Sequence, residues 1–270
     1  MTSTADGAPQ LPEGFYVRRS QDVYGSTSAV QGPWDPGSQH GGPPSALLAS
    51  AIEERTGRPG LRIVRVSVDF LGPIPVGELS VAVRVLRPGR RVQLAEAELA
   101  HDGKVVAVAR AWQHAVDAAP DAAAGTPDGA APPLPAPVPD GGAMMSAFGY
   151  GRAIEWRTTA GSADEPGPGA VWARPRVPLI AGTAMTGLQR ALVVADSANG
   201  ISLSLPLDRF LSMPTSLNVG FLRHPAGPWV HMDARTDFSG DGVGLTRAEL
   251  ADDSGLLAVV SQPLLIAARG

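Results

Sequence analysis

The chain of 270 residues contains two stretches that repeat each other at a constant distance. Ala97-Glu98-Leu99 recurs as Ala248-Glu249-Leu250, and Phe70-Leu71 recurs as Phe221-Leu222. The offset is 248 − 97 = 151 in the first pair and 221 − 70 = 151 in the second. This period is far longer than the roughly 20–50 residues of a solenoid repeat. The repeat therefore indicates a duplication, and it predicts two similar halves in one chain.

The segment 117–142 consists almost entirely of Ala, Pro, Gly and Asp, which is typical of a flexible linker. It lies where two duplicated halves have to be joined. We therefore expect a flexible tail at 1–10, an N-terminal domain at 11–116, this linker, and a C-terminal domain at 143–270.

Each half shows the same order of elements, a helix followed by antiparallel strands. In the first half we expect an apolar helix over 41–54, because Pro43 and Pro44 suit a first turn and Gly57 suits an end. Alternating apolar residues predict strands at 64–70, 79–85, 91–100 and 104–113, with a hairpin turn at Asp102-Gly103. In the second half we expect a helix over 183–198, stopped by Asn199-Gly200, and strands at 215–223, 229–236, 243–251 and 256–267.

A sheet curled around one buried helix is the simplest way to cover both elements. The pattern therefore predicts an α+β fold of the tandem hotdog type, in which two antiparallel sheets each wrap around a long central helix. Open edge strands invite further pairing, so we also expect a homodimer.

Composition excludes several function classes. The net charge is −4 and no basic stripe follows the chain, so we expect no nucleic-acid partner. There is no cysteine, no Gly-x-Ser-x-Gly, no HExxH and no phosphate-binding loop, and the five histidines show no paired ligand spacing. We expect neither a metal nor a cofactor. No apolar stretch approaches the roughly 18 residues of a membrane span, so we expect a cytoplasmic protein without a membrane partner.

A set of motifs runs through most of the chain outside the tail and the linker: Gly32-Pro33-Trp34-Asp35-Pro36, Gln39-His40-Gly41-Gly42-Pro43-Pro44, Ala46-Leu47-Leu48, Trp172-Ala173-Arg174, Pro178-Leu179, Asp196-Ser197-Ala198-Asn199-Gly200, Gly227-Pro228-Trp229, Asp233-Ala234-Arg235-Thr236, Gly242-Val243-Gly244-Leu245 and Ser261-Gln262. In combination they resemble actinobacterial thioesterase-like double-hotdog proteins, relatives of acyl-CoA thioesterase II. The resemblance implies hydrolysis of a fatty or polyketide-type acyl thioester carried by coenzyme A or by an acyl carrier.

The resemblance also implies a site in which an Asp, a Thr and a Gln of the second hotdog polarise a water. The Thr corresponds to Thr236 and the Gln to Gln262. Counted back from Arg223, the Asp position falls on Ser216, with Asn218 on the same strand face. Neither side chain is a base at neutral pH, so the hydrolytic machinery looks altered.

Other polar residues are candidates for contact with substrate. Gly41 and Gly42 precede a helix and offer two N–H donors to a carbonyl oxygen, or they simply allow tight packing. His40 is either a replacement base or a capping group. Asp196 lies near a helix end that disfavours negative charge, so it is either a site residue or a turn former. Gln262 needs a hydrogen-bond partner on a buried strand, which water, substrate or the protein itself can supply.

Three functions fit these observations. The first is an acyl-CoA thioesterase-like enzyme that activates water. The second is a non-hydrolytic acyl-binding protein, or a recruited biosynthetic enzyme, that keeps the pocket without the Asp. The third is an enoyl-thioester hydratase using His40 and Asp69, for which the sequence offers no further motif.

Overall fold

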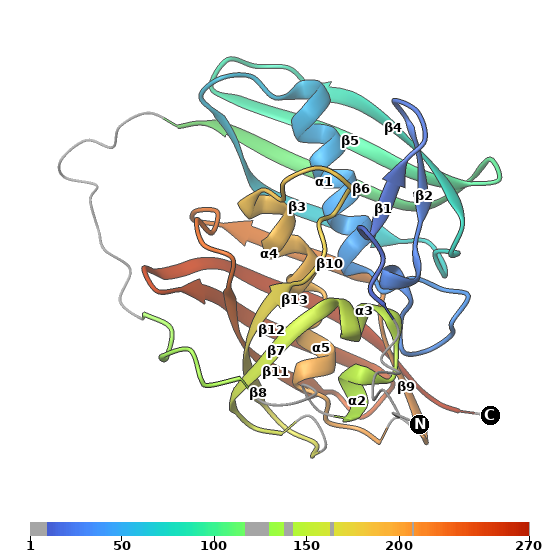
Figure 1. The fold of residues 1–270 in the computed structure, drawn as a ribbon, viewed down its shortest axis with the longest axis vertical. Coiled ribbons are helices and arrows are strands. Elements are labelled where there is room, and N and C mark those ends of the chain that lie inside the picture. The colour runs from blue at the N-terminus through green and yellow to red at the C-terminus, as the bar shows by residue number, and fades with distance from the viewer. Residues whose placement is uncertain (1–9, 117–129, 138–142, 163–164, 207, 270) are drawn as a thin grey trace, which may run out of the picture.

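The computed structural model describes residues 10–116, 130–137, 143–162, 165–206 and 208–269. The N-terminal half contains β1 (Tyr16–Arg18), β2 (Val23–Ser26), the short 3-10 helix η1 (Ser28–Val30), α1 (Gly42–Thr56), β3 (Leu61–Phe70), β4 (Glu78–Arg87), β5 (Val92–His101) and β6 (Lys104–Ala115). The rest contains α2 (Ala143–Ser146), α3 (Gly149–Ala153), β7 (Ile154–Ala160), β8 (Gly169–Pro175), α4 (Gly187–Ala195), α5 (Ala198–Ile201), β9 (Phe210–Pro214), β10 (Ser216–Phe221), β11 (Val230–Phe238), β12 (Val243–Asp252) and β13 (Gly255–Ala268) (Figure 1).

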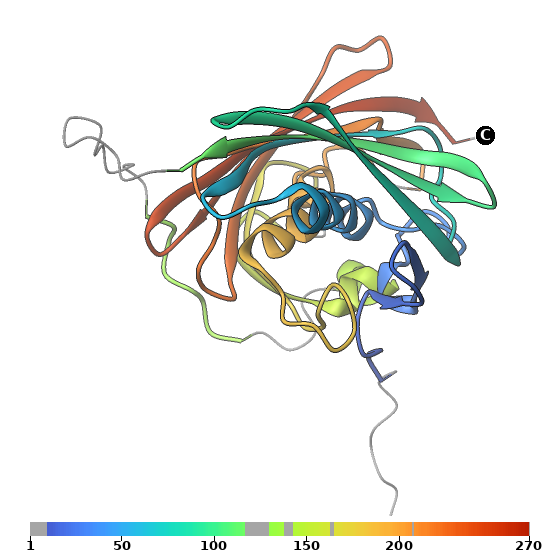
Figure 2. The same ribbon diagram turned by 90° about the horizontal axis from the view of Figure 1, so that it is seen from above.

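All strands belong to one antiparallel sheet, in the order β1-β2-β4-β5-β6-β3-β10-β13-β12-β11-β8-β7, with β9 paired to β13. Strands β3 and β10 join the two halves, so the two separate sheets expected from the sequence are one continuous sheet. Each of these strands would otherwise be an open edge with unpaired backbone groups. The sheet curves, and α1 and α4 lie against its concave face (Figure 2).

The helix α1 is close to the one expected over 41–54. Pro43 and Pro44 occupy its first turn, and Gly57 follows its last residue as the C-cap. All residues from Gly42 to Ala49 are buried. A helix that is apolar nearly all round is a core element, which explains its place between the sheet and the other helices.

The second helix is shorter than the one expected over 183–198. Thr186 caps α4 through a capping box with Gln189, and α4 ends at Ala195. After a turn at Asp196 and Ser197 the chain forms α5, which contains Asn199 and Gly200. Asn199-Gly200 lies within α5, so the expectation that it stops the helix is wrong. At the break between α4 and α5, the backbone of Asp196 and of Asn199 hydrogen-bonds to Gln262 of β13.

The duplication found in the sequence is repeated in the pairing of the strands. Ala97 pairs with Ala109 in the first half, and Ala248 pairs with Val260 in the second, both shifted by 151 residues. The register shift between Leu99 and Ala100 in the β5–β6 pair recurs between Leu250 and Ala251 in the β12–β13 pair. The two halves are therefore copies in register as well as in sequence.

An approximate two-fold axis relates the halves. At the joint between β3 and β10, Ser67 pairs with Asn218, its own counterpart 67 + 151 = 218. Between the helices, a Cβ on Gly42 would lie 2.2 Å from the carbonyl oxygen of Val193 in α4. The axis therefore passes through the β3–β10 pair, and Gly42 is required where α1 and α4 meet.

Most of the linker expected at 117–142, and most of the tail at 1–10, lies outside the described residues. The described part at 130–137 runs along the sheet edge: Trp172 Nε1 donates to the Pro132 carbonyl at 2.9 Å, and Arg157 donates to that of Pro135 at 2.7 Å. No described helix is long and apolar enough to cross a membrane.

Candidate active site

Gln262 lies in β13, on the face of the sheet that packs against the helices. It is fully buried, between the buried Val260 and Leu264 on the same face. Its side-chain Nε2 donates to Oδ1 of Asp196 at 2.9 Å, and its Oε1 accepts the backbone N–H of Asn199 at 3.1 Å. The amide is therefore held at both ends, which fixes its orientation at the break between α4 and α5.

Asp196 is the carboxylate of this cluster. Burial raises the pKa of its carboxyl to about 7, although hydrogen bonds from the Gly41 backbone and from Gln262 work in the opposite direction. A carboxyl group with such a pKa exchanges a proton near neutral pH, as a general base does. Asp196 is the C-cap of α4, where the helix dipole disfavours negative charge, and its carboxyl is buried rather than exposed in a turn.

The two glycines at the start of α1 use their N–H groups within the protein. Gly41 donates to Asp196, and Gly42 donates to Nδ1 of His40 at 3.2 Å. A Cβ on Gly41 would lie 2.7 Å from Oδ2 of Asp196, and one on Gly42 would meet the Val193 carbonyl. The glycines therefore allow close packing and orient Asp196 and His40, while neither N–H is left over for a substrate carbonyl in this arrangement.

His40 is neutral in this environment, because burial lowers the pKa of its imidazole to about 3. Its ring stacks on Tyr150 with centroids 3.7 Å apart, and its Nδ1 lies 3.3 Å from Oδ2 of Asp196. Since Nδ1 accepts from Gly42, the tautomer we assign carries the proton on Nε2. His40 is thus a neutral hydrogen-bond donor rather than a cation.

Thr236 does not contact Gln262 directly but belongs to the same inward-facing row of side chains. Its hydroxyl lies 2.7 Å from those of Thr246 and Ser202, and Thr246 is the cross-strand neighbour of Gln262. Ser212 and Asn199 extend the network at 3.0 Å. The result is a buried polar cluster between α4–α5 and the strands β9 and β11–β13.

Ser216 and Asn218 lie on the other face of the sheet. Leu217 and Val219 are fully buried under the helices, and side chains alternate along a strand, so Ser216 and Asn218 point to the convex face. There Asn218 accepts a hydrogen bond from Ser67 at 2.6 Å and contacts Ser216 at 3.4 Å. The structure does not bring these two residues together with Gln262.

A narrow cavity of about 50 Å³ opens beside the cluster. Its polar side is formed by His40, Tyr150, Ser197 and Asn199. Its apolar side is formed by Pro33, Trp34, Met144, Met145, Phe148 and Leu203. A small apolar group placed there would lie against the residues that hold Asp196 and Gln262.

The first half has no such polar cluster at the equivalent positions. Subtracting 151 places Ala111 opposite Gln262 and Ala95 opposite Thr246. Both alanines are fully buried, and they pair with each other as Thr246 and Gln262 do. At these two strand positions the first half is therefore apolar where the second half is polar.

Sequence reasoning missed Tyr150, Ser202 and Thr246 as members of the cluster. For Thr246 a signal existed, because it lies two residues before Ala248 on the buried face of β12. For Tyr150, whose hydroxyl lies 2.7 Å from that of Ser197 and donates to the Val193 carbonyl, only the tertiary structure reveals the contact.

Comparison with known proteins assigns the chain to a family. Models of the acyl-CoA thioesterase N-terminal and C-terminal domains match residues 30–114 and 120–266. The chain belongs to the acyl-CoA thioesterase family. Its substrate class is accordingly an acyl thioester. No curated protein matches the chain.

Solved structures show the same fold. A candidate thioesterase from Novosphingobium aromaticivorans is 25% identical with a TM-score of 0.68, covering 93% of this chain and 98% of the other. Acyl-CoA thioesterase II TesB2 from Mycobacterium marinum is 16% identical with a TM-score of 0.65, covering 94% and 95%. A protein with a hotdog fold from Alicyclobacillus acidocaldarius is 18% identical with a TM-score of 0.69, covering 94% of this chain and 96% of the other.

The described residues contain no group of three metal-ligating side chains.

Proposed function

We propose that this protein hydrolyses a short acyl thioester of coenzyme A or of an acyl carrier, with Asp196 as the general base. The observation that carries this proposal is the buried Asp196–Gln262 pair, 2.9 Å apart, beside a cavity in a chain of the acyl-CoA thioesterase family. A carboxylate whose pKa is about 7 is half ionised at neutral pH and is matched to proton transfer there.

In the proposed reaction a water held by Asp196 and Gln262 attacks the thioester carbonyl carbon. Asp196 accepts the proton of the water as the C–O bond forms, and the carbonyl oxygen gains negative charge. The tetrahedral species then breaks its C–S bond, and the proton on Asp196 leaves with the thiolate as a thiol. The products are a carboxylic acid and the free carrier thiol.

His40 is the residue we assign to the developing negative charge. Its neutral imidazole lines the cavity, and its Nε2–H is a donor that needs no charge of its own. Loss of one such donor typically costs about 10²–10³-fold in rate. The role we assign to Thr236, Thr246 and Ser202 is structural. Their hydroxyls link β11 and β12 to the end of α5 and do not contact the reacting atoms.

In this proposal the general base is Asp196, and not Ser216 or Asn218, the positions that the resemblance indicated for the family's Asp. Asp196 has the carboxylate that a base requires and a direct bond to Gln262. Ser216 and Asn218 have no titratable group near neutral pH and lie on the opposite face of the sheet.

Release of thiol from a series of acyl-CoA and acyl-pantetheine thioesters tests the proposal. We expect turnover by the wild-type protein and a loss of about 10²–10⁴-fold in Gln262→Ala and Asp196→Asn. Asp69→Asn is the matched control, because Asp69 is exposed in β3. Absence of turnover on every thioester refutes hydrolysis.

The second candidate is non-hydrolytic binding of an acyl thioester in the same pocket. It predicts saturable binding without thiol release, and turnover in Ser216→Asp if the carboxylate belongs at Ser216.

The enoyl-hydratase hypothesis requires Asp69 near His40, whereas Asp69 is exposed and His40 is buried beside Asp196.

The finer architecture belongs to the same proposal. A tandem hotdog, divided at 117–142 into domains 11–116 and 143–270, accounts for the 151-residue offset and for the order of the strands. A homodimer and a cytoplasmic location remain predictions. Sedimentation of the purified protein tests the dimer.

A further inference from the structure

The segment 130–137, which we call the strap, is fastened to the outer part of the sheet. It forms neither helix nor strand, and four of its eight residues are prolines, at positions 132, 133, 135 and 137. Its backbone N–H at Ala131 donates to the Asp252 carbonyl of β12 at 3.4 Å. Its carbonyls at Pro132 and Pro135 accept from Trp172 of β8 and Arg157 of β7. The strap therefore crosses the border of the sheet from β12 to β7.

Trp172 lies on the face of the sheet that points away from the helices. Its neighbours Val171 and Ala173 belong to the main core, and side chains alternate along β8, so the indole points the other way. Trp172 is nevertheless only 1% exposed. The strap, whose Pro132 carbonyl accepts from the indole, thus helps to cover Trp172 on this outer face.

The indole is held in place by a row of side chains on neighbouring strands. Arg157 and Trp172 are direct cross-strand partners, and Trp172 is in turn the partner of His231. The His231 ring meets the indole edge-on with centroids 5.3 Å apart, and its Nε2 lies 3.0 Å from the Thr159 hydroxyl. None of these contacts involves the strap, so the N–H donor of Trp172 is oriented independently of it.

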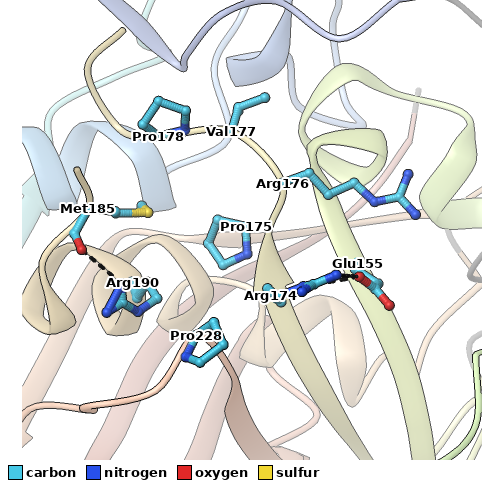
Figure 3. A pocket seen from close by; sticks show the side chains of 9 residues that line it. All are labelled: Glu155, Arg174, Pro175, Arg176, Val177, Pro178, Met185, Arg190 and Pro228. Atoms are coloured by element: carbon cyan, nitrogen blue, oxygen red, sulfur yellow. Dashed lines mark hydrogen bonds and ion pairs between the residues drawn. The ribbon is translucent and has the colours of Figure 1, made fainter. Parts of the chain in front are cut away.

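The second donor, Arg157, is oriented in the same way. Its guanidinium donates to Glu155 at 2.7 Å and lies over the Trp229 ring, 4.7 Å from the centroid. Arg174 points at the same Glu155 carboxylate, as Figure 3 shows, and donates to it at 3.1 Å. Burial raises the pKa of Glu155, but the hydrogen bonds from Arg157 and Arg174 outweigh it and keep the carboxyl ionised. Donors fixed beforehand lower the entropic cost of binding a ligand.

The accepting carbonyls have the spacing of a polyproline II helix. This helix has three residues per turn and no internal hydrogen bonds, so its carbonyls are free to accept. Pro132 and Pro135 are three residues apart, so in this conformation their carbonyls point the same way, about 9 Å apart along the axis. Segments of the form PxxP dock in this conformation into grooves lined by aromatic rings. Pro132-Pro133-Leu134-Pro135 has this form, and Trp172 and Trp229 supply the rings.

We propose that the outer row of Arg157, Trp172 and His231, with Trp229, is a groove that binds polyproline II segments, and that the strap is its resident ligand. Recognition runs through main-chain carbonyls, and the Leu134 side chain is 38% exposed, so the groove recognises the conformation more than a particular side chain. A PxxP segment of another protein binds there only when the strap has left. Because the strap belongs to the same chain, it competes at a high effective concentration and inhibits such binding.

Calorimetric titration of the full-length protein with a synthetic peptide of residues 130–137, blocked at both ends, tests the groove. The titration uses the wild type and a strap variant with the substitutions Pro132→Gly, Pro133→Gly, Pro135→Gly and Pro137→Gly, which make the strap costlier to order. We expect the peptide to bind the strap variant and not the wild type. A peptide with the same four glycines is the control and should bind neither protein.

Trp172→Phe, introduced into the strap variant, should weaken peptide binding about fivefold, because it removes one hydrogen-bond donor and keeps an aromatic ring. Trp112→Phe in β6 is the matched control and should leave the affinity unchanged. No binding to the strap variant, or binding that Trp172→Phe leaves unchanged, overturns the groove.

Hydrogen exchange of the Trp172 indole N–H, followed by NMR, measures the contact without any added peptide. The signal is identified by its absence in Trp172→Phe. It should exchange at least about tenfold faster in the strap variant than in the wild type, because the variant releases the strap more often. The indole of Trp156, which donates to the Gly151 carbonyl, is the internal control and should exchange equally in both. Equal exchange of the Trp172 indole in both proteins would show that the strap does not occupy the groove.

Discussion

Replacement of Asp196 by Asn should lower activity and, above neutral pH, raise stability. The carboxyl has an ordinary pKa of 3.8, and burial raises it to about 7 in the folded protein. The folded state therefore binds more protons than the unfolded state between about pH 4 and pH 7, and stability falls as pH rises through this window. An amide does not ionise and escapes this loss.

The size of the effect follows from the two pKa values. The raised pKa of Asp196 lowers the free energy of unfolding of the wild type by about 4 kcal/mol at pH 8 and by about 2 kcal/mol at pH 5. Asn cannot replace every hydrogen bond, and an unsatisfied Gly41 N–H costs about 1–3 kcal/mol at either pH. The difference in unfolding free energy between variant and wild type should therefore move by about 2–3 kcal/mol in favour of the variant from pH 5 to pH 8.

Urea unfolding of both proteins at pH 5 and pH 8 measures this shift, with Asp69→Asn as the control that should show none. In parallel, the pH profile of kcat/KM should rise with an apparent pKa of about 7 in the wild type and be lost in Asp196→Asn. Parallel loss of stability in wild type and variant would mean that Asp196 ionises normally, and the base assignment would be wrong.

Further predictions follow from the packing of the site. Gly42→Ala should destabilise the protein by about 1–3 kcal/mol in urea unfolding, because its Cβ would clash with the Val193 carbonyl, whereas Gly220→Ala, with open space around it, should not. The cavity of about 50 Å³ is a third of the ~150 Å³ that holds benzene, so kcat/KM should peak at acyl groups of about two to four carbons. Met144→Ala should shift that peak to longer chains. His40→Gln should lower kcat by about 10²–10³-fold.

The strands and one helix could be predicted because their signals are local. The alternation of Val64, Val66 and Val68 marks β3, and the hairpin at Asp102-Gly103 has positive φ at both residues, 48° and 77°. Strands β1, β2, β7, β8 and β9 were not predicted. They are short or lack a clean alternation of apolar and polar residues, so their own sequences carry little strand signal.

The site was harder to predict because its residues meet only through tertiary packing. Asp196 and Gln262 are separated by 66 residues and come from a helix end and a strand. Counting along the sequence placed the missing carboxylate at Ser216, although the apolar Leu217 and Val219 already indicated that Ser216 faces away from the core. Side chains alternate between the two faces along a strand, so a residue next to a buried residue points to the opposite face. A count of positions from a motif does not take this alternation into account.

The duplication explains how one half can carry a polar cluster where the other does not. Contacts between the halves, such as Gly42 against the Val193 carbonyl, must satisfy both at once, so a change there disturbs the helix pair. Positions away from this contact carry no such constraint. Thr246 and Gln262 of the second half stand at the positions of Ala95 and Ala111 in the first, although the two pairs of strands have the same register. Close packing between the halves therefore preserves the fold while one half acquires polar side chains inside it.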